Sequence, residues 1–358
     1  MKSLINRNKS LLALVSVACA SVLVLGTAMY GVSSAGASSK SVAYSGATAL
    51  PSVRSGGISL TVGAVYLDAE GFYGGIEAGI KAAAKYYDLH LLQENVEADA
   101  ATEASFMESL IAANVTGIVT SPVNVTSSAP AIIQAVKKGI PVVCYNTCLT
   151  PADTAKYIKA FVTSNQYQMG VSDGKYAVSY FKSKHMADPE IGMINCAVFE
   201  ACLQRDQGFE ATLKAGVPGA KIVTNQEAIT LDDTTSTAEE ELVAHPDLAA
   251  IYADEESAAE GAVLGIIAKK HQNQTVVFGS DITVEEANYM LKYPNILVAT
   301  VGQQPQVMGY DAMQQLINVI THHKVTSFIY VPTLFFESSQ PSFIHHWLNE
   351  PIHKGGLP

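Results

Sequence analysis

The chain has 358 residues, more than a single small core usually serves, so its length predicts two lobes or domains. It carries 33 acidic and 22 basic side chains, a formal net charge of -11, and the basic residues are scattered. Because nucleic-acid binding needs clustered positive charge to neutralise phosphates, this balance argues against a nucleic-acid partner.

Residues 1–37 have the pattern of an export signal. The segment begins with a basic stretch, continues through an uncharged apolar run at 10–32, and ends in the small residues Ala35, Gly36 and Ala37. The apolar run is also long enough to span a bilayer, so a retained anchor is the alternative to a cleaved signal peptide. We therefore predict a periplasmic or other extracytoplasmic location, free or held at the membrane.

Residues 38–57 are rich in Ser, Gly and Ala and predict a flexible leader. From residue 58 onward, short apolar runs alternate with stretches of helical periodicity, with a less regular stretch at 150–165. The predicted strands lie at 58–67, 89–92, 117–122, 141–145, 190–195, 220–225, 248–253, 275–280, 296–301 and 325–332. Strands that alternate with helices are typical of parallel sheets covered on both faces, so we predict the α/β class with two lobes and a cleft between them.

The cysteines of the body form two local pairs, Cys144 with Cys148 and Cys196 with Cys202. An oxidising compartment permits disulfides, and each pair is close enough in sequence to close a small loop. Buried thiols are the alternative. We predict disulfides and no metal site, since no histidine stands at ligand spacing from either pair. Lipid modification of Cys19 is a weaker reading, because the usual leucine before such a cysteine is missing.

Aromatic, amide and acidic side chains follow the predicted strands, where ligands of open α/β sheets bind. The candidates are Glu70, Phe72, Tyr73, Asn146, Thr147, Glu255, Asp281 and Gln303. Flat rings suit the C–H faces of polyols, and planar amides or carboxylates bridge neighbouring hydroxyls. The structural alternative is that acidic and amide residues here cap the next helix and that Phe72 packs beneath it.

Catalytic signatures are missing from the sequence. It has no G-x-S-x-G nucleophile elbow and no G-x-x-x-x-G-K-[ST] phosphate loop, and the glycines after the first strand do not form a dinucleotide fingerprint. We therefore predict a binding protein without a cofactor and treat an exported enzyme as the minor alternative.

Several segments together resemble the ribose-type group of periplasmic binding proteins, which serve sugar ABC transporters. The matching segments are GAVYLDAEGFYGGIEAGIKAAAKYYDLHL, GIVTSPVNVTSSAPAIIQAVKKGIPVVCYN, RDQGFEATL, HPDLAAIYADEESAAEGAV, VVFGSDIT and VATVGQQPQVMGYDAM, in the family's order over about 58–332. The resemblance implies a type I fold, two Rossmann-like lobes joined by a three-strand hinge. We place the crossings near Ser164-Asn165, Gln303-Gln304 and Val331-Pro332.

These crossings set the expected domain boundaries. The N-terminal lobe would comprise 58–164 plus 304–331, the C-terminal lobe 165–303 plus 332–345, and a surface-packed tail 346–358.

The resemblance also assigns roles to the candidates. Phe72 and Tyr73 fall where the family stacks rings on the sugar, and Asp281 and Gln303 fall on a family aspartate and glutamine. Asn146, Thr147 and Glu255 replace a family aspartate, arginine and asparagine.

A second family arginine is also missing, since Leu203 stands in its place. Arg205 could substitute for it, although Arg205 lines up better with a helix-surface residue. These departures weaken the expectation of an ordinary pyranose or ribose as the ligand.

We thus predict a monomer that captures a sugar or sugar-like polar molecule and delivers it to an ABC transporter permease. The alternatives are a sensory binding protein of the same fold and a binder of a non-sugar solute. A repressor of the related regulator family is excluded by the export signal and the lack of a basic helix-turn-helix.

Overall fold

The computed structural model describes residues 60–69 and 71–350, all of which fall within one compact unit at 50–358. The predicted export signal at 1–37 and leader at 38–57 lie outside the described residues. Within the part of the chain that is described, no helix is both long and apolar enough to cross a membrane.

The first lobe is built on a six-stranded parallel sheet in the order β11-β5-β4-β3-β1-β2. Its strands are β1 (Thr61–Tyr66), β2 (His90–Asn95), β3 (Ile118–Thr120), β4 (Val142–Tyr145), β5 (Ala160–Thr163) and β11 (Phe328–Tyr330). Its helices are α1 (Gly71–Tyr86), α2 (Ala100–Ala112), α3 (Ala129–Lys137), α4 (Pro151–Tyr157) and α10 (Pro305–Ile320).

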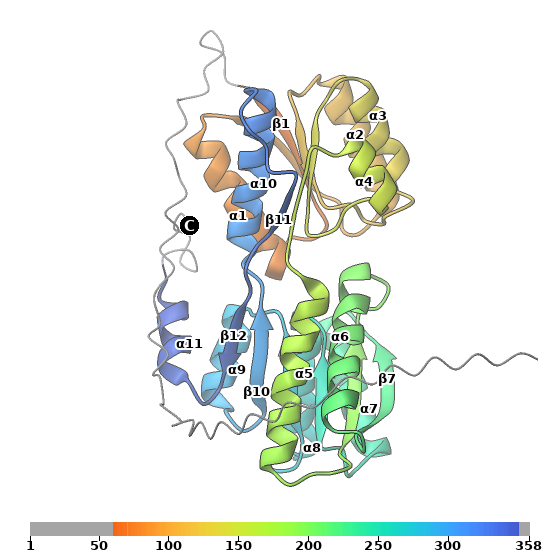
Figure 1. Cartoon of the computed structure of the whole chain (residues 1–358), viewed down its shortest axis with the longest axis vertical. Coiled ribbons are helices and arrows are strands. Elements are labelled where there is room, and N and C mark those ends of the chain that lie inside the picture. Colours follow the sequence, from red (N-terminus) through yellow and green to blue (C-terminus); the bar gives the residue numbers. More distant parts are fainter. Residues whose placement is uncertain (1–59, 70, 351–358) are drawn as a thin grey trace, which may run out of the picture. The chain divides into compact units, whose positions relative to one another are not determined.

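Helices α1 and α10 lie side by side over one face of this sheet, and α2 and α3 lie over the other (Figure 1). Successive strand side chains point to opposite faces, so Ala64 and Tyr66 join the core under α1 and α10 while Val65 joins the core under α2 and α3. Burial on both faces explains why these strands appear in the sequence as continuous apolar runs.

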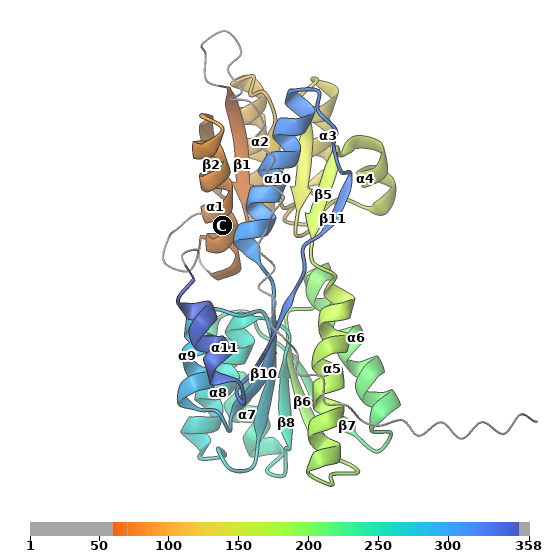
Figure 2. The same cartoon turned by 60° about the vertical axis from the view of Figure 1, so that its left-hand side comes forward.

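The second lobe has a six-stranded sheet in the order β12-β10-β9-β8-β6-β7, parallel except for β12, which pairs antiparallel with β10. Its strands are β6 (Glu190–Asn195), β7 (Lys221–Glu227), β8 (Ala250–Ala253), β9 (Val276–Ser280), β10 (Leu297–Gly302) and β12 (Leu334–Glu337). Its helices are α5 (Gln166–Ser183), α6 (Glu200–Gly216), α7 (Leu231–Ala244), α8 (Glu256–Lys269), α9 (Val284–Lys292) and α11 (Pro341–Leu348). Figure 2 shows α5 and α6 together on one side of the sheet and α7, α8 and α9 on the other.

The chain passes between the two sheets three times, after β5, after β10 and after β11. The predicted fold class is therefore confirmed: two α/β lobes with largely parallel sheets are joined by three crossings. Because all parallel strands of a sheet end at the same edge, each lobe collects its strand-end loops on one side.

Two regions differ from the sequence prediction. The stretch at 150–165 is regular and contains α4 and β5, which escaped notice because α4 buries no side chain and β5 has four residues. The predicted start of a surface-packed tail at residue 346 is wrong, because helix α11 continues through this position to Leu348. Trp347 is 5% exposed and meets the Phe336 ring edge-on at a centroid distance of 5.3 Å, inside the core of the second lobe.

Candidate functional site

A cavity of about 360 Å³ is lined by loops that follow strands of both sheets. The first lobe contributes the loops after β1, β2, β3 and β4, and the second contributes those after β6, β7, β8, β9 and β10. Pockets for small ligands in proteins begin at about this volume and normally combine apolar walls with a few convergent polar groups.

The structure brings eight of the nine predicted ligand-binding residues to this one cavity. The eight that line it are Phe72, Tyr73, Asn146, Thr147, Arg205, Glu255, Asp281 and Gln303. The ninth, Glu70, lies outside the described residues. Their participation in ligand binding stays a prediction.

Asn146 forms the turn at the end of β4 in the left-handed region, with φ of 56°. Asparagine tolerates this conformation better than most residues do. The turn is held by the Thr163 hydroxyl, which donates to the Asn146 carbonyl at 2.8 Å, and by the predicted disulfide between Cys144 and Cys148, whose Cα atoms lie 5.5 Å apart. The next side chain, Thr147, shares a hydroxyl contact of 2.8 Å with Ser121.

The two aromatic rings at the start of α1 serve the core and the cavity at once. Phe72 is 8% exposed, packs in the core of the first lobe and also lines the cavity. The packing alternative drawn from the sequence therefore holds, and a contact of Phe72 with a ligand stays a prediction. The Tyr73 ring meets it edge-on at 5.1 Å. The Tyr73 hydroxyl accepts a hydrogen bond from Asn146 Nδ2 at 3.0 Å. Burial raises the pKa of Tyr73, so its phenol stays neutral.

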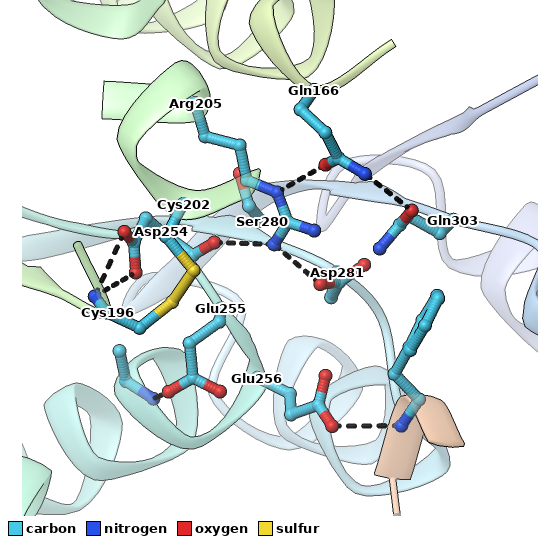
Figure 3. Close-up of polar contacts among 12 residues, drawn as sticks. Gln166, Cys196, Cys202, Arg205, Asp254, Glu255, Glu256, Ser280, Asp281 and Gln303 are labelled. Carbon is cyan, nitrogen blue, oxygen red and sulfur yellow. Dashed lines mark hydrogen bonds and ion pairs between the residues drawn. A yellow bond between two sulfur atoms is a disulfide. The ribbon is translucent and has the colours of Figure 1, made fainter. Parts of the chain in front are cut away.

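The family resemblance matches Arg205 better with a helix-surface residue, and this expectation is wrong: Arg205 is 3% exposed and contacts Asp281 and Gln166 (Figure 3). Its Nη1 donates to Asp281 Oδ2 at 2.6 Å and to the Asp254 carbonyl at 2.7 Å. Burial alone would lower the pKa of this guanidinium, but the Asp281 and Asp254 carboxylates raise it overall. Arg205 therefore remains a cation that fixes Asp281.

Gln166 connects this ion pair to the rest of the cavity and was missed in the sequence. Its Oε1 accepts from Arg205 Nε at 2.7 Å, and its Nε2 donates to Gln303 Oε1 at 3.1 Å and to Asn146 Oδ1 at 3.4 Å. Gln166 directly follows the first crossing, so its contacts join groups of both lobes. Its position beside the predicted crossing at 164–165 was the one sequence signal that could have identified it.

Asp281 ends β9 in the left-handed region, with φ of 74°. It is 5% exposed, and one carboxylate oxygen is bound by Arg205 while Oδ1 has no hydrogen-bond partner among the described residues. Buried acceptors are nearly always satisfied in folded proteins, so an unsatisfied oxygen beside a cavity is available to a donor on a ligand.

Glu255 and Glu256 stand where β8 passes into α8. Glu255 caps this helix, accepting from the backbone N–H groups of Ser257 at 2.9 Å and Ala258 at 2.7 Å. Glu256 accepts from the backbone N–H of Phe72 at 2.9 Å, a contact between the lobes that sequence reasoning did not anticipate. Burial, with Asp254 and Asp281 nearby, raises the pKa of Glu255 to about 8. Burial, with Asp281 and Glu255 nearby, raises the pKa of Glu256 well above its usual value.

The second predicted disulfide, Cys196–Cys202, is also formed and lines the cavity, with Cα atoms 5.5 Å apart. The Asp254 carboxylate lies beside it and accepts from the Cys196 backbone N–H. The two sulfurs and an Asp254 oxygen lie within 4.8 Å of one another, the spacing of a metal site. Because the sulfurs are bonded to each other, they offer no thiolate for a metal.

Comparisons of the sequence with known proteins find similarity to binding proteins. The family profile described as "Periplasmic binding protein domain" matches residues 64–324. The chain is 35% identical over 302 residues to the "ABC transporter periplasmic-binding protein YphF" of Escherichia coli (strain K12), covering 84% of this chain and 91% of that protein.

The solved structures with the same fold include two with a bound sugar or cyclitol. One, from Mycobacterium smegmatis in complex with β-D-fucofuranose, has a TM-score of 0.76 and 20% identity, and the match covers 83% of this chain and 97% of the other. The other, an ABC transporter solute-binding protein from Bacillus halodurans with bound myo-inositol, has a TM-score of 0.72 and 19% identity, with 81% and 97% covered.

Proposed function

The chain belongs to the periplasmic binding protein domain family, and from this premise we propose that it captures a sugar or sugar-like small polar molecule and delivers it to an ABC transporter permease. The ligand would occupy the cavity between the strand-end loops of the two lobes. The observation that carries this proposal is the convergence of eight separately predicted side chains on that cavity.

The chemistry of the lining supports a ligand rich in hydroxyl groups. Phe72 offers an apolar ring to C–H groups, while Asn146, Asp281 and Gln303 offer oxygen and nitrogen atoms to hydroxyls. Hydrogen bonds to charged groups contribute about 1.5–3 kcal/mol each, so a few of them give micromolar affinity. The myo-inositol and fucofuranose bound to the two structural neighbours belong to this class of ligand.

The proposal includes location and partners. The protein would be exported, act as a monomer outside the cytoplasm, and use no cofactor and no catalytic step. The permease would bind the ligand-loaded form. Fractionation of cells that express the full chain tests the location, and an exclusively cytoplasmic protein would contradict it.

The test of the ligand class is a thermal-shift screen of the purified protein against monosaccharides, cyclitols, nucleosides and amino acids. Ligand at 100 times its Kd stabilises a one-site binder by about 2.7 kcal/mol, which corresponds to a shift of a few degrees. We expect hits among sugars or cyclitols that disappear in Asp281→Ala and Gln303→Ala and persist in Glu108→Ala, an exposed acid on α2. Hits confined to nucleosides or amino acids would keep the fold and reject the ligand class.

A further inference from the structure

The cavity is strongly acidic. Among the described residues that line it, five are acidic and Arg205 is the single Lys or Arg. The acidic residues are Asp68, Glu200, Glu255, Glu256 and Asp281. The charge of Arg205 is already matched by Asp281 in a buried pair at 2.6 Å. Glu255 and Glu256 therefore face the cavity without an ion-pair partner among the lining residues.

Three of these carboxylates gather at one place, because the strands that carry them are neighbours. β8 and β9 pair in parallel with Ala253 opposite Gly279, so Glu255 and Glu256 emerge beside Asp281. Figure 3 shows these three side chains around a common space, below the Arg205 guanidinium.

The contacts of the three groups leave them without a positive partner, apart from the bond of Asp281 to Arg205. Glu255 and Glu256 accept from backbone N–H groups, and neither forms an ion pair with a Lys or Arg of the described residues. Asp281 Oδ1 is buried and unsatisfied. This unsatisfied oxygen is an independent sign that this corner of the cavity accepts a hydrogen bond from a ligand donor.

We propose, as a refinement that rests on the proposed function, that the ligand carries a protonated amine and is an amino-substituted sugar or cyclitol whose ammonium group lies among Glu255, Glu256 and Asp281. An ammonium group has three donors and one positive charge, which suits three converging acceptors of which only Asp281 already has a cationic partner. Coulomb attraction in a partly dry cavity is several times stronger than in water. A neutral polyol would instead leave these groups to be neutralised by protons, in line with the raised pKa of Glu255 and Glu256.

The experiment is titration calorimetry of the purified protein with matched pairs of ligands. Each pair consists of a neutral compound and the corresponding amine. The pairs are D-glucose with D-glucosamine, D-galactose with D-galactosamine, and myo-inositol with an amino-deoxy inositol. N-acetyl-D-glucosamine controls for the bulk of the added group without its charge. We expect the amine of at least one pair to bind at least about tenfold more tightly than both its neutral counterpart and, where tested, its N-acetyl form.

Two variants locate the effect. Glu255→Gln and Glu256→Gln each replace a carboxyl by a neutral amide of the same shape, which keeps one oxygen to accept a backbone N–H. We expect each to weaken binding of the amine at least about tenfold more than it weakens binding of the neutral partner. The matched control is Glu241→Gln on the same lobe. This carboxyl is also buried, with its pKa also raised to about 8, but it does not line the cavity. Glu241→Gln should leave the affinities for the amine and for its neutral counterpart unchanged. Thermal unfolding checks that each variant is folded.

The outcomes separate the two proposals. Tight binding of a neutral member with no gain for its amine would overturn the amine inference and leave the sugar-binding function in place. Amine binding that survives both cavity variants would also overturn it. If neither the neutral compounds nor their amines bind, both proposals are contradicted.

Discussion

The two lobes contribute different chemistry to one cavity. The first lobe supplies Phe72, Tyr73, Asn146 and Thr147, which are aromatic, amide or hydroxyl groups without charge. The second supplies one guanidinium and most of the carboxylates. Each lobe has a left-handed residue and a disulfide after strands of its sheet. In the first lobe the disulfide encloses the left-handed Asn146, whereas in the second the disulfide follows β6 and the left-handed Asp281 follows β9. From this difference we expect substitutions in the first lobe to alter the shape of the cavity and substitutions in the second lobe to alter its charge.

The largest effect should come from the charged side. Arg205→Ala would leave Asp281 buried without its ion-pair partner and remove one hydrogen bond of Gln166. We therefore expect the free energy of unfolding to fall by about 3–5 kcal/mol and ligand binding to be lost. The measurement is urea unfolding. The control is Lys269→Ala, which removes a half-exposed pair with Glu239 and should cost less than about 1 kcal/mol. Equal losses in both variants would refute the special role of Arg205.

Buried acids should make stability depend on pH in both lobes. Burial raises the pKa of Glu241 in the second lobe to about 8 and raises that of Glu103 in the first. A raised pKa means that the folded state binds more protons than the unfolded state, so stability falls as pH rises from about 4.5 through 8. We expect a loss on the order of 2–3 kcal/mol between pH 5 and pH 9, measured by urea unfolding. Glu241→Gln should flatten part of this profile, and an unchanged profile would show that Glu241 is not protonated in the fold.

The disulfides should stabilise the two lobes by similar amounts but affect the ligand differently. Each closes a short loop, for which the chain-entropy account gives about 2 kcal/mol. Replacing both cysteines of either pair by alanine should therefore cost similar stability in calorimetric unfolding. Only Cys196–Cys202 lines the cavity, so its removal should lower ligand affinity more than removal of Cys144–Cys148 does. A larger loss of affinity on removal of Cys144–Cys148 would contradict this expectation and would mean that the first-lobe disulfide determines the shape of the site.

The smallest effect concerns the contact between the lobes at the start of α1. Gly71 has φ of 52°, and a Cβ there would lie 2.0 Å from Glu256 Oε1. Gly139 has φ of 87° and nothing within 4 Å of its Cβ position. Both alanine variants should lose about 1 kcal/mol of stability from backbone strain. We expect only Gly71→Ala to weaken ligand binding as well, because only it displaces Glu256, and equal affinities in calorimetry would exclude a role for this contact.

Most of the fold and the position of the cavity follow from the sequence. Apolar runs that alternate with helical periodicity predict parallel sheets, and parallel strands bring their carboxyl ends to a common edge. Asn146, Glu255, Asp281 and Gln303 each follow a strand, so their meeting at one cavity could be predicted without coordinates. The α4–β5 segment and the α11 helix could not, because their buried patterns are too short to stand out from loops.

Local sequence patterns are enough to predict where the strands end and which side chains stand there. Which of those side chains become partners depends on the packing of the whole chain. Arg205 and Asp281 are 76 positions apart, and Phe72 and Glu256 are 184 positions apart. No local pattern encodes either pair. Contacts at such separation depend on how the helices pack and how the three crossings orient the sheets, and the charge balance of the cavity is settled at the same stage.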